Sequence, residues 1–396
     1  VGILSYNPSD ENANTYLLKS VRMLSEDERI FAAEVIGEIA TAQFSGYLVE
    51  LLEDHNLHVV EKAIIAAGNL HDSRLANILV NKLSITSLQG TTSLALRHFG
   101  ESALYDLDLG LTSPEATRQE KLHIIDTIRE IGGDKASETL LRHIEIKIPE
   151  LRHQIYLSLA SLHYQADPDD QYIFVNNVDE EVRLITWLLA AMEDISNAES
   201  YATLHAALSS ELDIRRDNML LLISFLFPSI VMLDTRANID SKVAELRVFA
   251  LEILDNLLTG EIKQIVLPLL DDLTVSERLE QMSIRFPQEK MLPDDRFTDI
   301  VSTHFEQAFF WTKSCILYQI GTGELGAHID EVNQGLTSRE AIIRETALWC
   351  LSRLGPPDLR RRVASLLGDT NEQVKSIAHS IYSSLPAPVA DPGPNN

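Results

Sequence analysis

The sequence predicts an all-α fold, a right-handed α-solenoid of about ten to eleven stacked helix pairs with an irregular insertion. Three observations carry this prediction. Apolar residues recur with a helical period, and a residue that marks the end of a helix recurs at a nearly constant spacing. Aromatic residues make up only 6% of the chain, so the core must consist mostly of the smaller aliphatic residues that suit short helical units.

The stretch 47–70 shows the repeating unit most clearly. Its apolar residues predict a first helix over Gln43–Glu53 and a second helix over Leu57–Leu70. Asp54 and Asn56 lie in the turn between them, where a short polar side chain can accept from the free N–H groups that open a helix. Near the end of the second helix comes Gly68, where a missing side chain permits close helix packing or helix termination.

The position of this glycine recurs along the chain. Gly37, Gly68, Gly100 and Gly132 are separated by 31, 32 and 32 residues, and His163 follows 31 residues later. An amphipathic helix pair cannot bury its apolar face alone, and stacking on a neighbouring pair supplies the cover. The sequence therefore predicts a regular array over residues 13–165.

The expected helix pairs of this array are 13–24 with 26–39, 43–53 with 57–70, 73–83 with 87–99, 103–111 with 115–131, and 135–146 with 149–163. Ser113 and Pro114 suit the start of one second helix, because serine is a good cap and proline a good first helical residue.

Between 166 and 303 the spacing varies, which indicates insertions, and insertions often carry binding surface. Expected helices there are 178–194, 214–227, 246–258, 261–270 and 276–282, followed by a loop over 286–295. Regular helices return over 305–320, 324–335, 339–354, 357–367 and 371–385. The expected organisation is thus a single solenoid over 1–385, irregular at 166–303 and regular at 304–385, with a disordered Pro-rich tail at 386–396.

Composition excludes several function classes. The net charge of −26 repels phosphate backbones and anionic lipids, so it favours solubility or a basic partner over nucleic-acid binding. Cys315 and Cys350 lack the spacing of a metal site and are expected to be small buried apolar residues.

The apolar run 219–233 is too short to span a membrane. It predicts a buried helix and the segment that leaves this helix, with an exposed apolar contact surface as the alternative. Because the chain starts at Val1 without a signal segment, it is expected to be a piece of a longer protein.

A small motif recurs in several units. Asp369 precedes Val374 and Lys375 by five and six residues, and Asn177 precedes Val182 and Arg183 by the same spacing. The early position of the second helix is basic in four units, at Arg29, Arg152, Arg247 and Arg344. In this motif the chain from about Ala13 to Leu385 resembles the HEAT-repeat superfamily of armadillo-like α-solenoids. The resemblance implies the fold and says little about function.

A narrower resemblance lies in Leu246–Leu279, through the segments LEILDNLL and VLPLLDD and through Glu277 to Leu279. This stretch is similar to the HEAT region that follows the transporter module of bacterial membrane proteins related to ATP/ADP translocases. The resemblance implies a soluble cytosolic module of a larger membrane protein, located in the cytoplasm at the inner face of the membrane and tethered there by a transmembrane module outside this sequence.

Catalytic chemistry is not predicted. The sequence holds no His-Glu dipeptide, no HExxH and no GxSxG, so no metal, cofactor-binding or catalytic residue is expected. The glycine-rich segment 321–326 lacks the preceding strand and the lysine of a phosphate-binding loop, and predicts a tight turn instead. The basic triplet Arg360–Arg362 is expected to form a solvated face, with docking to an acidic partner as the alternative.

Two functions remain. The favoured one is a non-catalytic scaffold whose concave surface, lined by the second helices, binds a protein partner or a neighbouring domain. The alternative is a HEAT-type enzyme resembling bilin-chromophore lyases, with a pocket near Trp311, Tyr318 and His328. Six residues are the candidate contacts: Trp187, Arg215, Arg216, Phe309, Phe310 and Trp311. Charge reversal at Arg215 and Arg216 is expected to weaken partner binding without unfolding the protein.

Overall fold

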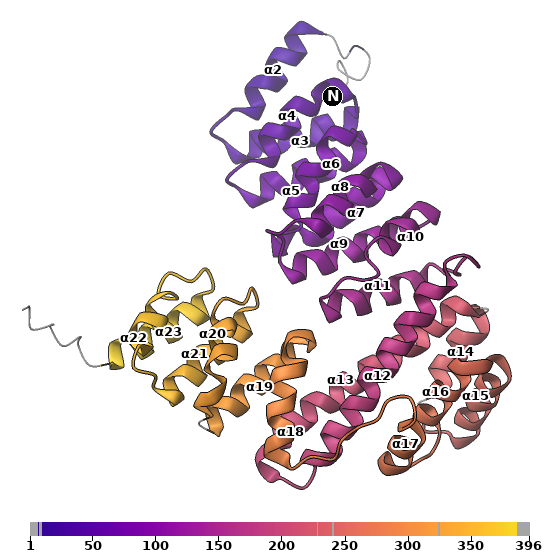
Figure 1. The fold of residues 1–396 in the computed structure, drawn as a ribbon. Coiled ribbons are helices and arrows are strands. Elements are labelled where there is room, and N and C mark those ends of the chain that lie inside the picture. The colour runs from indigo at the N-terminus through magenta and orange to yellow at the C-terminus, as the bar shows by residue number, and fades with distance from the viewer. Residues whose placement is uncertain (1–6, 8–9, 228, 240, 324, 386–396) are drawn as a thin grey trace, which may run out of the picture. The chain divides into compact units, whose positions relative to one another are not determined.

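The computed structural model describes residue 7 and residues 10–227, 229–239, 241–323 and 325–385, so the expected tail at 386–396 lies outside the described residues. Within these ranges the regular structure is entirely helical, as predicted. The chain divides into two compact units, unit 1 over Val1–Tyr164 and unit 2 over Gln165–Asn396 (Figure 1). The boundary lies beside the position where the regular spacing ends in the sequence. A continuous solenoid over 1–385 stays a prediction.

Unit 1 consists of short helices in pairs. In chain order they are α2 (Glu11–Val21), α3 (Glu26–Ile39), α4 (Ser45–Leu52), α5 (Leu57–Leu70), α6 (Ala76–Lys82), α7 (Gln89–Phe99), α8 (Leu104–Thr112), α9 (Arg118–Ile131), α10 (Asp134–Leu141) and α11 (Pro149–Ser161). The second helices α3, α5, α7, α9 and α11 pack one on the next, and α6, α8 and α10 do the same on the other side of each pair (Figure 1). Each pair thus covers the apolar side of its neighbour.

The second helices of unit 1 are each followed by a residue with positive φ. These residues are Ala40, His71, Gly100, Gly132 and His163, at φ values of 49°, 53°, 57°, 75° and 55°. Their spacings are 31, 29, 32 and 31 residues. A positive φ after the second helix, rather than glycine itself, is therefore the feature that repeats, although a positive φ normally favours glycine.

Two of the four repeating glycines lie inside a helix and not at its end. Gly37 and Gly68 lie inside α3 and α5, where a Cβ would come within 3.0 Å of the Ala66 Cα and within 3.1 Å of the Ala95 Cα. A side chain at either position would force neighbouring second helices apart. The prediction that all four glycines share one structural position is therefore wrong, since two of them permit close packing and two end a helix.

The start of α9 also differs from the prediction at Ser113 and Pro114. The helix begins at Arg118, and Thr117 forms a reciprocal cap in which its hydroxyl accepts from the Glu120 N–H and the Glu120 carboxylate accepts from the Thr117 N–H. Two matched hydrogen bonds satisfy free N–H groups at the helix start more completely than one serine does.

Unit 2 begins with two long helices of 25 residues each, α12 (Gln171–Ile195) and α13 (Ala202–Leu226), which pack against each other. The following helices are α14 (Ser229–Ile239), α15 (Ala244–Leu257), α16 (Gly260–Leu270), α17 (Val275–Met282), α18 (Pro293–Asp299), α19 (Phe310–Thr322), α20 (Ile329–Leu336), α21 (Ala341–Leu354), α22 (Leu359–Ala364) and α23 (Glu372–Ser384). A π-helical segment, Ile300–His304, follows α18.

The expected helices 178–194 and 214–227 are only the C-terminal parts of α12 and α13. Both helices start earlier, and the additional turns carry polar residues, such as Asn177 and Glu211, that are buried and did not look like core positions in the sequence. The apolar run 219–233 begins in the last turns of α13, where Met219–Phe225 are buried, and continues into α14. In the part of the chain that the structure describes, no helix combines the length and apolar character that crossing a membrane requires.

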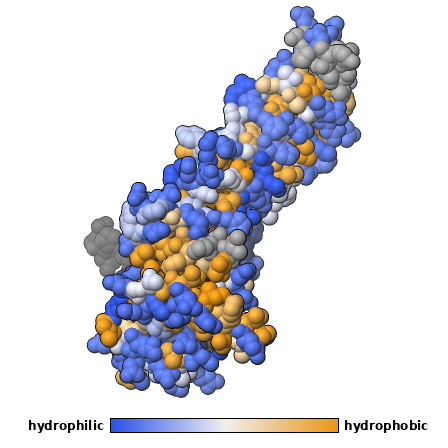
Figure 2. All heavy atoms as spheres, turned by 90° about the vertical axis from the view of Figure 1, so that its right-hand side faces the viewer, coloured by the Kyte–Doolittle hydropathy of each residue, from blue (hydrophilic) through white to orange (hydrophobic). Residues whose placement is uncertain are grey.

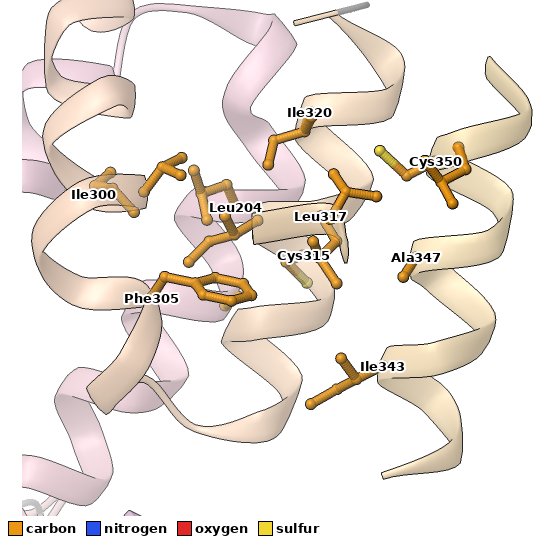
Figure 3. Packing of buried hydrophobic residues seen from close by; sticks show 14 of the residues in the cluster. Leu204, Ile300, Phe305, Cys315, Leu317, Ile320, Ile343, Ala347 and Cys350 are labelled. Carbon is orange, nitrogen blue, oxygen red and sulfur yellow. The ribbon is translucent and has the colours of Figure 1, made fainter. Parts of the chain in front are cut away.

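The main core of unit 2 joins α13, the π-helical segment, α19 and α21 (Figure 3). Leu204, Ile300 and Phe305 face Cys315 of α19, and Cys350 of α21 lies on its other side (Figure 3). Both cysteines are free and buried, as predicted, and burial raises the pKa of Cys315 to about 11 and that of Cys350 to about 12. Neither thiol is activated as a nucleophile.

An arginine near the start of a second helix is paired with the aspartate before the next second helix. Arg29 of α3 donates from Nε and Nη2 to Asp54 at 2.6 and 3.2 Å, and its Nη1 donates to the carbonyls of Met23 and Leu24 at 2.9 and 3.1 Å. Asp54 also accepts from the Asn56 N–H at 2.8 Å. Such an arginine–aspartate pair is termed a rung below.

A second rung in unit 2 repeats this geometry. Arg344 of α21 donates to Asp369 at 2.7 Å from both Nε and Nη2, and its Nη1 donates to the carbonyls of Ser338 and Arg339. Asp369 accepts from the Asn371 N–H at 2.8 Å. Both rungs span 25 residues, and their side chains are largely buried. Bidentate charge-assisted pairing of this kind fixes one helix pair against the next.

The variant Arg344→Gln tests the contribution of a rung to stability. Since it leaves the Asp369 carboxylate buried without its guanidinium, we expect the free energy of unfolding at pH 7 to fall by about 3 kcal/mol. The hydrogen bond from Arg344 lowers the pKa of Asp369, so this stabilisation is complete above the unfolded-state pKa near ~4 and is lost as the pH falls below it. Urea denaturation of both proteins at several pH values measures the difference.

Arg361→Gln is the control, because Arg361 is paired with Asp358 on the surface and its side chain is 84% exposed. It should change the free energy of unfolding by less than about 0.5 kcal/mol. An equal loss in the two variants would show that the rung has no special role.

Candidate functional site

Trp187 of α12 lies at the edge of a buried polar network in unit 2. Its Nε1 donates to Asp299 at 3.1 Å, and its ring packs against the His304 ring with 4.5 Å between centroids. The His304 side chain is fully buried and its Nε2 lies 3.0 Å from the Glu211 carboxylate. The π-helical segment brings His304 to this position from outside α12 and α13.

Arg215 of α13 lies inside the same network, and only 2% of it is exposed. Its guanidinium lies 3.4 Å from Glu181 of α12 and 3.3 Å from Glu211, one turn earlier on α13. It also donates to the Gln307 carbonyl at 3.2 Å and lies 5.2 Å from the centre of the Phe309 ring. The prediction of Arg215 as a surface contact is therefore wrong, because two buried carboxylates hold it in the interior.

The network is organised by charge balance. Burial by itself would raise the pKa of Glu211, but His304 and Arg215 outweigh that effect and lower the pKa below its usual range. Glu211 and His304 form the kind of pair used in acid–base catalysis, and here both side chains are fully buried. The arrangement ties α12, α13 and the start of α19 together.

Of the six candidate contacts, the structure thus brings Trp187, Arg215 and Phe309 to one network. Glu181, Glu211 and His304 also belong to this network, although none of them was a candidate from the sequence. The one local signal was the Glu211–Arg215 spacing of four residues, which places both side chains on the same side of α13.

The remaining aromatic candidates lie at the start of α19. Phe310 is half-buried against the unit 2 core, whereas Trp311 is 51% exposed. Tyr318 is seven residues later on the same helix face, is 42% exposed, and stacks on Trp349 of α21 with 4.9 Å between ring centroids and 16° between planes. Trp311, Tyr318 and Trp349 are termed the aromatic face below.

Gly321 of α19 makes room for this stack. A Cβ at that position would come within 2.6 Å of the Trp349 ring and 3.1 Å of the Cys350 Cα. The expectation that Gly321 forms a turn is corrected, since it lies within α19. His328, which was expected near Trp311 and Tyr318, packs edge-on against the buried Phe297 ring at 5.9 Å.

Unit 1 carries a groove between the second helices α3 and α5, with a volume of about 380 Å³. Its lining residues are Ala33, Glu34, Gly37, Glu38, Lys62, Ile65, Ala66 and Asn69. Lys62 lies 3.3 Å from Glu34 across the groove, and Ile65 is exposed. Gly37 and Ala66, where α3 packs closely against α5, therefore also line this groove.

Arg216, next to the buried Arg215, lines a polar cavity of about 190 Å³ in unit 2. The cavity is lined by Arg216, Ile239, Ser241, Arg247, Leu270, Asp271, Asp272 and Arg278, and is termed the arginine pocket below. Three guanidinium groups, from α13, α15 and α17, converge on it. Arg216 lies at this cavity, and its predicted role in partner binding stays a prediction.

Apolar side chains gather on the face of unit 2 where α14 and α15 lie (Figure 2). Leu246, Val248 and Phe249 of α15 are exposed, and they flank Arg247 in the sequence. Among the described residues, no group of three or more His, Cys, Asp or Glu side chains is arranged to hold a metal ion.

Comparison with known proteins adds little. The chain matches no protein-family model, and no curated protein matches it. A solved structure described as an engineered protein aligns at 14% identity over 93% of this chain and 97% of the other, with a TM-score of 0.30. A likeness at this level carries no argument about fold or function.

The variant Arg215→Glu tests the buried network. It would add a third carboxylate beside Glu181 and Glu211, so we expect the free energy of unfolding to fall by at least about 3 kcal/mol, with Trp187 becoming more exposed. Urea denaturation followed by tryptophan fluorescence measures this loss. Arg361→Glu, a reversal on an exposed side chain, should leave the transition nearly unchanged, and an unchanged transition in Arg215→Glu would show that Arg215 is not held inside.

Proposed function

We propose that this chain is a HEAT-type right-handed α-solenoid that acts as a non-catalytic scaffold and binds a protein partner or neighbouring domain through its second helices. The rungs support the HEAT assignment. Arg29–Asp54 and Arg344–Asp369 join a second helix to the turn before the next one in the same way in both units. The HEAT signature of an acidic residue before the second helix and a basic residue within it is thus matched by a physical contact.

The observation that carries the binding function is the aromatic face. Trp311 and Tyr318 expose large rings on α19, and Gly321 keeps Trp349 stacked beside them. Exposed aromatic side chains that are held rigidly dominate the binding energy of many protein interfaces, because little entropy is lost when they are covered.

Unit 1 supports the same proposal independently. Second helices there expose the large apolar residues Phe31, Ile65 and Leu94. Ile65 lies in the α3–α5 groove, which also presents Glu34 and Glu38. Together with the net charge of −26, these carboxylates favour a partner segment that combines apolar and basic side chains over nucleic acid.

The larger context is proposed from the resemblance of Leu246–Leu279 to the HEAT region of translocase-related membrane proteins. That stretch forms the helices α15, α16 and α17. In this proposal the chain is the cytosolic module of a membrane transporter and lies at the inner face of the membrane. The alternative of a chromophore-lyase-like enzyme is less favoured, because Trp311 and Tyr318 are exposed whereas His328 packs on the buried Phe297.

Photo-crosslinking tests the binding face. A benzoylphenylalanine at Tyr318 should crosslink a partner in the source cells, because this side chain lies on the aromatic face. Tyr105 of α8 is the matched control, since it is also a tyrosine, is 69% exposed and lies on a first helix. Crosslinking at Tyr105 but not at Tyr318 would contradict the proposal, as would equal crosslinking at both positions.

Fractionation of the source cells tests the membrane context. An antibody against this chain should detect a band much larger than 44.3 kDa in the membrane fraction if the chain belongs to a transporter. A soluble band near 44.3 kDa would overturn the transporter proposal and leave a free-standing scaffold, with the crosslinking result unaffected.

A further inference from the structure

The groove between α3 and α5 in unit 1 has an acidic lining. It contains two carboxylates, Glu34 and Glu38, and one cation, Lys62, and the segments 33–38 and 62–69 that line it are described throughout. Lys62 lies 3.3 Å from Glu34, so these two charges balance each other. The Glu38 side chain is exposed and makes no hydrogen bond or ion pair with any described residue. The negative charge of Glu38 is therefore the one that the lining does not balance.

A second acceptor lies at the same end of the groove as Glu38. Asn69 of α5 donates from its side-chain amide to the carbonyl of Gly37, the neighbour of Glu38 on α3, at 3.4 Å. Glu38 and Asn69 are also the last lining residues of their helices. Because the amide nitrogen of Asn69 makes this bond, its amide oxygen can accept from a ligand. A group with several N–H donors would satisfy both side chains at once.

The rest of the lining is mostly apolar and small. Ala33, Gly37 and Ala66 carry no atom beyond Cβ, and Gly37 packs close to Ala66. Ile65, of which 45% is exposed, is the large apolar residue of the groove. The groove therefore combines apolar surface with two acceptors at one end.

We propose that this groove binds an arginine side chain of the protein partner, with the guanidinium on Glu38 and Asn69 and an apolar neighbour of that arginine on Ile65. The inference rests on the proposed scaffold function and defines the chemistry of the partner at one site. Arginine combines an apolar stem, which can lie along Ala33 and Ala66, with five donors at its end. Lysine carries its charge on a single nitrogen and is less suited to two acceptors on different helices.

The chain itself contains contacts of this type. In the rungs, Arg29 and Arg344 each bind a carboxylate and two carbonyls through one guanidinium. A guanidinium between Glu38 and Asn69 would bind one carboxylate and one amide carbonyl in the same manner. The net charge of −26 also favours the approach of a cationic segment over an anionic one.

Methyl NMR of the full chain with labelled isoleucine tests the site, because the Ile65 methyl groups report contacts in the groove. The variant Ile65→Val identifies their signal. The probe is a synthetic peptide in which one arginine is flanked by leucines, and the comparison peptide carries citrulline, which has the shape of arginine without its charge. At low ionic strength we expect the arginine peptide to shift the Ile65 signal saturably and the citrulline peptide to bind at least about fivefold more weakly.

Two matched variants separate the groove from general electrostatic attraction. Glu38→Gln should weaken binding of the arginine peptide by about fivefold and leave binding of the citrulline peptide within about twofold. Glu26→Gln is the control, since Glu26 is an exposed glutamate at the start of the same helix, about 18 Å from Glu38 along its axis, and does not line the groove. It should leave binding of both peptides within about twofold.

Three results would overturn the inference: no saturable shift of the Ile65 signal, equal binding of the two peptides, or an equal effect of Glu38→Gln and Glu26→Gln. Binding of agmatine, a small guanidinium compound, as tight as that of the arginine peptide would also overturn it, because the groove would then be a site for small cations. Crosslinking at Tyr318 is independent of these measurements, so failure at the groove is distinguishable from failure of the scaffold function.

Discussion

The structure depends on a contact between an arginine and an aspartate that are 25 residues apart. In the rungs Arg29–Asp54 and Arg344–Asp369 one guanidinium satisfies a carboxylate and two carbonyls at once. Arg152 of α11 makes an equivalent bond to the carbonyl of Ile146, six residues earlier. The arginine therefore closes the turn of its own helix pair and also fixes the next pair. Apolar stacking supplies the bulk of the stability, and the rung determines the register between neighbours.

Much of the fold could be predicted from the sequence, because the period of its apolar residues survives in most units. The helices expected at 26–39 and 57–70 match α3 and α5 as observed. Boundaries were wrong where local chemistry left several choices. Ser113 with Pro114 is a plausible helix start, yet the reciprocal cap between Thr117 and Glu120 determines the start of α9. Long helices such as α12 were underestimated because their polar residues are satisfied by partners that are distant in the sequence.

The candidate site was less predictable for the same reason. Arg215 and Arg216 are adjacent and chemically identical in the sequence, but successive helical residues point about 100° apart. One is therefore buried between Glu181 and Glu211, and the other lines the arginine pocket. The phase of the helix relative to the core, which only tertiary packing defines, decides whether an arginine is buried between two carboxylates or lines a cavity. The same holds for Phe309 and Trp311, of which the first is buried and the second is exposed.

Gly321 has a consequence for how this surface is encoded. The tryptophan that stacks on Tyr318 can lie there only because position 321 has no side chain. Gly321 is itself buried and would touch no ligand. The shape of the exposed aromatic face therefore depends partly on a buried residue, Gly321, which has no Cβ. A survey that ranks residues by accessibility would overlook this position, although a single methyl group there would reshape the aromatic face.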